Sequence, residues 1–508
     1  MKNVIEMLER SAAKYPDKVA FSDPGGQITF VELLTSSQKI ASKFLSDRVL
    51  SGSERSVLFF MEKSVAALPV MFGGVYAGAF YCFVDIRQSD ERAVSIIERV
   101  APSVVVTDSA NRERLERIIP KIRYMMVEDL TSSASLESME IDEAALETEI
   151  ATHTDQLPLY VNFTSGSTGQ PKGVVVCHAS VIDFIEVFTR TFGINESDVL
   201  ANQAPFDFDV SVKDIYSGLY TGATVRLIPR SYFTNPTQLM DYLCDGDITV
   251  IIWAVTAMCF VSIMNGFDYR KPGSLRLVMF SGEVMPVKQL NKWKKHLSSA
   301  TYVNLYGPTE ITCNCTYHVI DREYGLDENI PIGIPFDNEK VFLLDEEDKP
   351  VTDPNVEGEI CVGGICLALG YYKDSDRTSE VFVQNPLNTA YSERIYRTGD
   401  LGKYDDKGLL YYTSRKDHQI KHMGQRIELS DIELTTMAVD GVSRACCIYD
   451  QKKKKIVLFY TGEIEKSVLS DVLKEKLPEF MVPGRTEHME SLPVNKNGKI
   501  DRKQLEMM

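Results

Sequence analysis

Short apolar runs that suit strands alternate with helical stretches along most of this chain of 508 residues. β-Branched runs without charge occur at residues 56–60, 103–107 and 249–253, and a similar run occupies residues 275–280. Apolar spacing typical of helices appears between them, for example at residues 179–191. Strands that are apolar on both faces and separated by helices are typical of parallel sheets, so this alternation predicts an α/β fold.

The pattern changes twice towards the C-terminus. From about residue 341, short strands with frequent Gly and Asp predict a small barrel-like β part. From residue 417, strands and helices alternate again in a lysine-rich segment. Because a chain of this length exceeds a single core, we predict several domains. Residues 1–416 would form a large N-terminal domain with parallel-rich sheets, and residues 417–508 a small, mobile α+β domain.

The bulk composition excludes several classes of protein. A formal net charge of −17 argues against nucleic acid as a partner, because backbone phosphates need a basic face. The dense basic run at residues 452–455 predicts a solvated turn between two strands. Residues 65–84 carry no charge, but their Pro and Gly residues predict a buried helix, a turn and a strand rather than a membrane span. Ten cysteines without repeated spacing suit a reducing compartment, so we expect a cytoplasmic protein.

A loop rich in small residues is the strongest local signal. Residues 164–173 read Thr-Ser-Gly-Ser-Thr-Gly-Gln-Pro-Lys-Gly and follow an apolar strand-like run. Glycines let backbone N–H groups turn towards an anion, hydroxyls add donors and a lysine supplies charge. The loop lacks the spacing of the common nucleoside-triphosphatase and dinucleotide motifs. Its composition alone leaves two alternatives open, a phosphate-binding loop and a flexible surface loop.

Five further motifs follow this loop in a fixed order. They include Tyr-Gly-Pro-Thr-Glu at residues 306–310, Tyr-Arg-Thr-Gly-Asp at residues 396–400 and Asn-Gly-Lys-Ile-Asp-Arg at residues 497–502. Each motif is weak alone, but their order over nearly the whole chain resembles the adenylate-forming superfamily. That superfamily includes acyl-CoA synthetases, luciferases and nonribosomal-peptide adenylation domains. Within it, the chain is most similar to amino-acid adenylation domains of the D-alanine–carrier protein ligase type.

The resemblance implies that the chain uses ATP and Mg²⁺ to activate a small amino acid as an aminoacyl-adenylate. The C-terminal domain would then rotate about Asp417 and allow transfer to the phosphopantetheine thiol of a separate carrier protein. Two alternatives stay open. One is an acyl-CoA synthetase acting on a carboxylic acid without an amine, and the other is a non-catalytic nucleotide-binding homologue.

The same resemblance assigns roles at the nucleotide. Lys499 would bridge the substrate carboxylate and the α-phosphate, Thr309 would contact that phosphate, and Glu310 would bind Mg²⁺. Without the motifs, Lys499 would be read as a solvated terminal lysine and Glu310 as a helix cap. Further nucleotide contacts are expected from Thr164, Ser165, Gly166, Ser167, Thr168, Gly169, Lys172, Gly282, Glu283, Asn304, Tyr306, Asp400 and Arg415.

The resemblance also places an amino-acid pocket. Asp209 would pair with the substrate α-ammonium, because a buried carboxylate without a cation is costly. Phe280 and Leu305 would fill space and favour a small side chain. Lys213 would either receive a polar or acidic substrate group or extend to solvent, and we favour solvent. The expected lining is Val210, Lys213, Ile252, Val278, Phe280, Leu305, Cys313 and Asn314.

Overall fold

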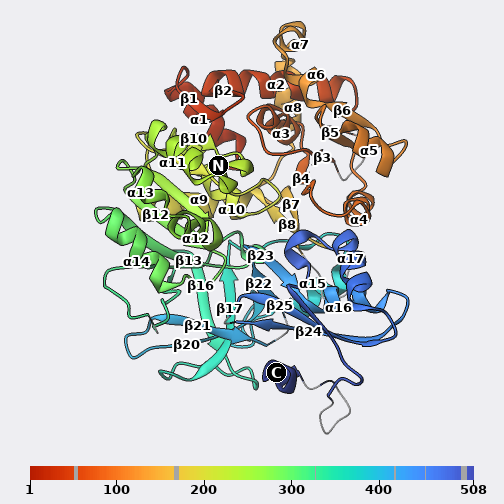
Figure 1. Cartoon of the computed structure of the whole chain (residues 1–508). Coiled ribbons are helices and arrows are strands. Elements are labelled where there is room, and N and C mark those ends of the chain that lie inside the picture. Colours follow the sequence, from red (N-terminus) through yellow and green to blue (C-terminus); the bar gives the residue numbers. More distant parts are fainter. Residues whose placement is uncertain are drawn as a thin grey trace.

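Two large parallel-rich sheets form the upper part of the molecule, and the C-terminal segment lies below them (Figure 1). The computed structural model describes residues 1–50, 55–164, 171–326, 328–416, 419–451, 453–493, 500 and 502–508, leaving aside the side chains of Arg426 and Lys503. The fold is mixed α/β, as the alternation of apolar runs predicts.

The first sheet has nine strands and carries most of the candidate site. The six strands from β13 to β1 run parallel. The strand predicted at residues 249–253 is β11, shifted by one residue. The order is β15 (Ile334–Pro335), β14 (Thr316–Val319), β13 (Thr301–Tyr306), β12 (Leu277–Ser281), β11 (Val250–Ala254), β9 (Val199–Asn202), β10 (Thr224–Leu227), β1 (Val19–Asp23) and β2 (Gly26–Thr29).

The second sheet has seven strands, and the five from β7 to β6 are parallel. Its order is β18 (Gly370–Tyr371), β8 (Lys172–Cys177), β7 (Pro158–Thr164), β4 (Phe80–Phe83), β3 (Ser56–Phe60), β5 (Val104–Thr107) and β6 (Tyr124–Met126). The uncharged run at residues 65–84 folds as α3 (Ala67–Tyr76), a turn at Gly78 with φ of 75°, and β4, as predicted. No helix in the described part of the chain has both the length and the apolar run needed to span a bilayer.

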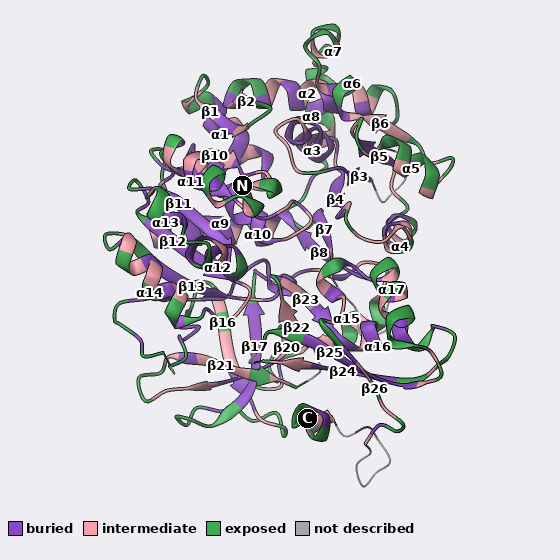
Figure 2. Cartoon of the chain, viewed as in Figure 1, coloured by how far each residue is buried: buried purple, intermediate pink, exposed green. Residues whose placement is uncertain are grey.

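Helices cover both faces of the nine-stranded sheet, whose central strands β11, β12 and β13 are almost entirely buried (Figure 2). Because side chains alternate along a strand, β11 and β12 contribute to two separate cores. Ile252 and Met279 share one core with α9 and α10, whereas Trp253 and Phe280 share the other with α12, α13 and α14. These helices are α9 (His178–Phe192), α10 (Val210–Thr221), α12 (Val255–Ile263), α13 (Gly266–Tyr269) and α14 (Val287–His296).

The remaining helices before the C-terminal segment lie mainly around the N-terminal strands. They are α1 (Ile5–Lys14), α2 (Phe30–Ser46), α4 (Asp90–Val100), α5 (Arg112–Ile118), α6 (Val127–Thr131), α7 (Ser133–Ser138), α8 (Glu143–Ala151), α11 (Pro236–Asp245) and α15 (Ser375–Val381). Helix α2 begins with a capping box, in which Thr29 and Glu32 each bond the other's backbone N–H. Such reciprocal bonds fix where a helix starts.

A third, antiparallel sheet curls into a half-barrel and confirms the predicted barrel-like β part. Its central strand β20 pairs with β17, β19 and β21. This pairing places Asp400 of β20 directly opposite Arg415 of β21. The strands are β16 (Glu339–Leu344), β17 (Glu357–Gly364), β19 (Phe382–Gln384), β20 (Arg394–Tyr404) and β21 (Leu410–Arg415).

The C-terminal segment has its own hydrophobic cores, separate from those of the large sheets. Lysines 453 to 455 are exposed between β24 and β25, which agrees with the predicted solvated turn. Asp417 lies outside the described residues, so the domain boundary and the hinge stay predictions. The elements are β22 (Gln419–His422), β23 (Gln425–Glu428), α16 (Leu429–Met437), β24 (Val442–Asp450), β25 (Lys455–Gly462), α17 (Lys466–Lys476), β26 (Arg485–His488) and α18 (Arg502–Glu506).

Candidate active site

The ends of the glycine-rich loop are held together by an antiparallel pair of strands. Thr164 ends β7, Lys172 begins β8, and the two residues are directly opposite in the register. The side chain of Lys172 is buried, with 4% exposed. The predicted phosphate contacts Ser165, Gly166, Ser167, Thr168 and Gly169 lie outside the described residues.

A buried carboxylate lies beside the end of this loop. Glu310 belongs to a short 3₁₀ turn, Thr309–Ile311, and its side chain is fully buried. The Tyr371 hydroxyl donates to Glu310 Oε1 at 2.7 Å, and Lys172 Nζ lies 3.4 Å from the same oxygen. Lys172 also lies 5.1 Å from the centre of the Tyr371 ring. The sequence analysis gave no sign of this contact of Tyr371.

The Glu310 carboxylate fits the chemistry expected for Mg²⁺. Mg²⁺ takes one or two protein carboxylates and completes its octahedral shell with water and substrate phosphate oxygens. Among the described residues, no group of three or more His, Cys, Asp or Glu side chains forms a denser metal site. A single-carboxylate Mg²⁺ site at Glu310 is therefore compatible with the residues present and stays a prediction.

Three predicted nucleotide residues form one buried cluster. The Tyr306 hydroxyl donates to Asp400 Oδ2 at 2.5 Å, and Arg415 Nη1 donates to Asp400 Oδ1 at 2.5 Å. Asp400 is 1% exposed, and burial next to this carboxylate raises the pKa of the Tyr306 hydroxyl well above its usual value. Lys421 of β22 lies 5.4 Å from the centre of the Tyr306 ring. The cluster thus holds a buried carboxylate, paired with an arginine, in a fixed orientation beside an aromatic ring.

The other expected adenine contacts lie on neighbouring strand ends. The Asn304 side-chain amide donates to the Pro331 carbonyl at 2.8 Å. Gly282, with φ of 96°, ends β12 in the left-handed region and turns the chain towards Glu283. Glu283 Oε1 accepts a hydrogen bond from the Gly424 backbone N–H at 2.6 Å, so the β22–β23 hairpin contacts the large domain here. Sequence reasoning gave no sign of this contact.

Asp209 lies at the start of α10 with 5% of its surface exposed. Burial raises the pKa of its carboxyl, while the nearby charge of Lys213 and a hydrogen bond from Thr309 act in the opposite direction. Asp209 forms no ion pair with any residue that the structure describes. A buried carboxylate of this kind is stabilised by a cation supplied from outside the protein.

The predicted pocket lining is wrong at two positions on β12. Val278 and Phe280 belong to the core on the far face of the sheet, where Phe280 shares a cluster with Trp253 and Trp293. Their neighbours Met279 and Ser281 take the near face, because a shift of one residue reverses the face of a strand. The near-face set consists of Val210, Lys213, Ile252, Met279, Ser281, Leu305, Cys313 and Asn314, all buried.

The expectation that Lys213 extends to solvent is also wrong. Its side chain is 0% exposed, and Nζ donates to Asn314 Oδ1 at 2.6 Å and to Ser281 Oγ at 3.4 Å. Burial lowers the pKa of the Lys213 ammonium, although Cys313 and Asp209 favour the charged form. The near-face set, where the substrate pocket is predicted, is therefore polar at Lys213, Ser281 and Asn314 and does not include Phe280.

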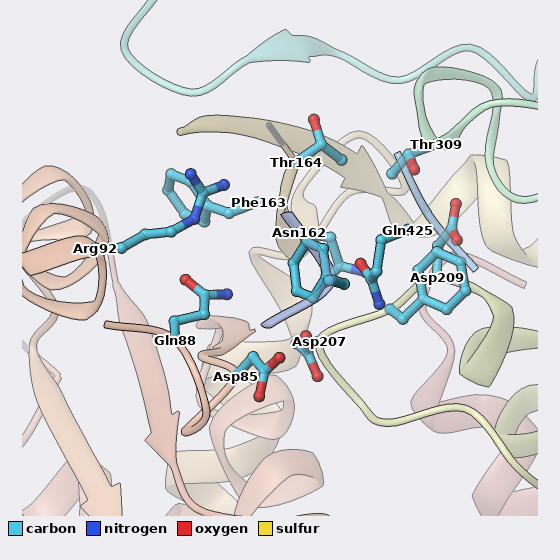
Figure 3. Close-up of a pocket in the computed structure, with 12 residues that line it drawn as sticks. Asp85, Gln88, Arg92, Asn162, Phe163, Thr164, Asp207, Asp209, Thr309 and Gln425 are labelled. Atoms are coloured by element: carbon cyan, nitrogen blue, oxygen red, sulfur yellow. The ribbon is translucent and has the colours of Figure 1, made fainter. Parts of the chain in front are cut away.

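A cavity of about 40 Å³ leads to Asp209, which is room for a water molecule or two. Figure 3 shows Gln88 and Arg92 on one side of this cavity and Asp209 and Thr309 on the other. Gln425 of β23 lies beside Asp209, so the C-terminal segment contributes to the wall. The full lining is Asp85, Gln88, Arg92, Asn162, Phe163, Thr164, Asp207, Phe208, Asp209, Thr309, Gln425 and Phe480.

Several polar atoms in this wall are buried without a hydrogen-bond partner in the described structure. They are Gln88 Oε1, Arg92 Nε, Asn162 Oδ1 and Thr164 Oγ1. Unpaired buried polar groups are rare in folded proteins and indicate a missing ligand or water. Sequence reasoning missed this cavity because its lining comes from six separate parts of the chain.

The expected catalytic lysine, Lys499, lies outside the described residues. Close to it in the sequence, Arg502 of α18 forms an ion pair with Glu433 of α16 at 2.5 Å. The β22–β23 hairpin contacts Glu283, and within the described part of the C-terminal segment Gln425 and Phe480 line the cavity.

A model of the AMP-binding enzyme family matches residues 8–372. The D-alanine–D-alanyl carrier protein ligase of Staphylococcus aureus is 30% identical over 519 residues, which cover 99% of each chain. Tyrocidine synthase 1 of Brevibacillus parabrevis is 28% identical over 99% of this chain, which spans only 45% of that synthase. The chain belongs to the AMP-binding enzymes of the adenylate-forming superfamily.

Solved structures of this superfamily share the fold. The Vibrio cholerae adenylation domain AlmE, in complex with glycyl-adenosine-5′-phosphate, matches with a TM-score of 0.84 at 21% identity, over 99% of this chain and 97% of that one. o-Succinylbenzoate CoA synthetase from Bacillus subtilis matches with a TM-score of 0.84 at 19% identity, over 100% and 99%. At this level of sequence identity, the structural similarity supports the fold only. The substrate has to be inferred from the residues of the site.

Proposed function

We propose that this chain activates the carboxylate of a small amino acid with ATP and then transfers the aminoacyl group to the thiol of a separate phosphopantetheinylated carrier protein. The observation that carries the proposal is Asp209. Its buried carboxylate forms no ion pair with any described residue, although the charge of Lys213 acts on it, and it lies next to Thr309 and Glu310. A substrate α-ammonium supplies the missing charge, which a plain carboxylic acid lacks.

The first step joins two anions, so the chain must supply positive charge where they meet. A carboxylate oxygen of the amino acid attacks the α-phosphorus of ATP, and the bond from that phosphorus to the pyrophosphate oxygen breaks. The aminoacyl-adenylate forms, and pyrophosphate leaves with the electron pair. Lys172, the loop amides and Lys499 are assigned to stabilise this charge, and Asp400 to accept the ribose hydroxyls. Glu310 would hold Mg²⁺, which would supply positive charge to the phosphates.

Transfer to a carrier thiol is supported by the cavity beside Asp209. A phosphopantetheine arm is narrow and carries amide groups, which match the unpaired atoms of Gln88 and Asn162. Gln425 brings the β22–β23 hairpin to this cavity, and the Gly424 N–H attaches the hairpin to Glu283. The S. aureus relative is named as a carrier protein ligase, which agrees with such an acceptor.

ATP–pyrophosphate exchange tests the proposal directly. Purified protein is assayed with the proteinogenic amino acids, D-alanine, β-alanine and simple carboxylic acids. We expect exchange with one small amino acid, lowered about 100-fold or more by Asp209→Asn, because the substrate ammonium then loses its buried counter-charge. Lys499→Ala is expected to abolish exchange, whereas Lys496→Ala, a lysine three residues away, serves as the matched control.

The alternatives give different results in the same assay. Exchange with plain carboxylic acids alone would assign the chain to the acyl-CoA synthetases. Absence of exchange with every compound, together with retained ATP binding, would favour a non-catalytic nucleotide-binding homologue. Transfer is checked separately by following radiolabelled amino acid onto a phosphopantetheinylated carrier protein.

A further inference from the structure

A buried cation lies in the near-face pocket without a carboxylate partner. Lys213 is 0% exposed, yet it forms no ion pair with any residue described in the structure. Its two hydrogen bonds go to neutral oxygens, Asn314 Oδ1 at 2.6 Å and Ser281 Oγ at 3.4 Å. An ammonium has three donors, so one of them stays available. The carboxylates of Asp209 and Asp214 act on Lys213 only from beyond ion-pair distance, and a buried charge without an ion pair is costly, which points to a ligand.

The second charge near this set of residues is Asp209. Its carboxylate and the Lys213 ammonium are neighbours but do not form an ion pair with each other. They are four residues apart at the start of α10, so they project from the same face one turn apart. Each is electrostatically coupled to the other, but no ion pair joins them. Lys213 instead turns to Asn314, across the pocket.

The spacing of this pair limits the size of a bridging ligand. One turn separates the two attachment points by about 6 Å along the helix. A molecule that contacts both charges must therefore carry an ammonium and an anionic group only a few bonds apart. The polar atoms of Ser281 and Asn314 lie on the Lys213 side, whereas Ile252 and Leu305 supply apolar walls.

We propose that the pocket selects an amino acid with a short acidic side chain, of aspartate or glutamate size, whose side-chain carboxylate pairs with Lys213 while its α-ammonium pairs with Asp209. This inference rests on the proposed function and names the substrate class of the same site. The α-carboxylate is left free to react with ATP. Asn314 and Ser281 position the Lys213 ammonium.

The test compares acidic amino acids with their own amides, which have the same shape without the charge. The panel is aspartate, glutamate, asparagine, glutamine, alanine, glycine and serine, each in both stereoisomers where they exist. For the wild-type enzyme, kcat/KM in pyrophosphate exchange is expected to be about 100-fold or more higher for one acidic amino acid than for its amide, because a buried polar group rejects a ligand that leaves it unpaired.

Variants then assign the preference to Lys213. Lys213→Met keeps the length of the side chain and removes the charge, so the ratio of acid to amide is expected to fall about 100-fold or more. Lys213→Arg is expected to keep a preference for the acid. Lys295→Met, on the exposed face of α14, is the matched control and is expected to leave the ratio unchanged. Circular dichroism and ATP binding report whether each variant is folded.

The possible failures are distinct. If the wild-type enzyme exchanges best with a neutral amino acid, adenylation stands and the acidic substrate is overturned. If Lys213→Met lowers exchange with acid and amide equally, Lys213 only supports Asn314, and the inference is wrong. If no amino acid supports exchange in the wild-type enzyme, the proposed function itself fails and this inference falls with it. Should Lys213→Met not fold, the wild-type ratio and Lys213→Arg decide.

Discussion

The cluster of Tyr306, Asp400 and Arg415 concentrates one negative charge in a buried position. Asp400 receives two hydrogen bonds, both at 2.5 Å, from groups that themselves are buried. Charge-assisted hydrogen bonds of this kind are the stronger ones in proteins. The carboxylate is therefore held in one orientation, as a receptor for paired hydroxyl groups needs to be.

We predict that Asp400→Asn raises the KM for ATP about 10- to 100-fold, because it removes the charged acceptor and leaves Arg415 without its counter-charge. The KM for the amino acid should change little, since Asp209 belongs to a separate part of the site. Exchange kinetics with each substrate varied in turn measure both constants. Asp406→Asn, at an exposed position, is the control. Equal increases in both KM values would contradict a nucleotide-specific role for Asp400.

Single residues also show where sequence reasoning succeeds and fails. The residues predicted at the ribose meet in space because β20 and β21 pair and place Asp400 directly opposite Arg415. Val278 and Phe280 failed because the apolar run gives no sign of which alternate residues face the pocket. The prediction that Lys213 extends to solvent failed because burial of a lysine depends on partners such as Asn314, 101 residues away in the sequence.

At the scale of elements, two helices end in the same way but in different surroundings. Gly193 closes α9 and Gly222 closes α10, both in the left-handed region, with φ of 60° and 79°. A Cβ added at Gly193 meets nothing within 4 Å, whereas one at Gly222 would lie 2.4 Å from the Tyr15 ring. Alanine substitutions at these two glycines therefore distinguish the cost of backbone strain from the cost of steric overlap.

We predict that Gly193→Ala lowers the free energy of unfolding by about 1 kcal/mol, from the left-handed backbone alone. Gly222→Ala should lower the free energy of unfolding by about 1–3 kcal/mol more than Gly193→Ala does, because the Tyr15 ring must move from a packed position. Urea unfolding followed by circular dichroism measures both. Equal losses would show that Tyr15 moves aside freely.

Elements were predicted better than their exact ends. The strand expected at residues 249–253 and the helix expected at residues 179–191 were correct to within a residue or so, because apolar periodicity marks buried elements strongly. The contact of the β22–β23 hairpin with Glu283 had no such signal. It joins surfaces 141 residues apart through a backbone N–H, which any residue can provide.

At the scale of the whole molecule, buried acids set how stability changes with pH. Asp214 is 0% exposed, Oδ2 accepts from Asn202 at 2.9 Å, and Oδ1 has no partner in the described structure. Burial raises the pKa of this carboxyl to about 7. In the folded chain it therefore binds a proton between about pH 4 and pH 7, while in the unfolded chain it does not.

Stability contributed by Asp214 must fall as pH rises through that window, by about 1 kcal/mol per pH unit. We predict that Asp214→Asn removes this decline. The free energy of unfolding of the variant relative to the wild type should therefore increase from about pH 5 to pH 7. Burial lowers the pKa of the Lys63 ammonium to about 7. This shift affects stability only above about pH 7, where it makes stability rise with pH. Urea unfolding at several pH values measures the difference, and parallel profiles would disprove the assignment.

The near-face pocket is confined to a short stretch of the chain. Its residues lie between Asp209 and Asn314, in α10, β11 to β13 and the turn that follows Glu310. The hairpin that contacts the cavity begins only at residue 419. Under the proposed function, choice of monomer and delivery to an acceptor are thus encoded in separate segments of a gene. A single recombination event between relatives can exchange one while the other is inherited intact, which allows new products to arise without rebuilding the enzyme.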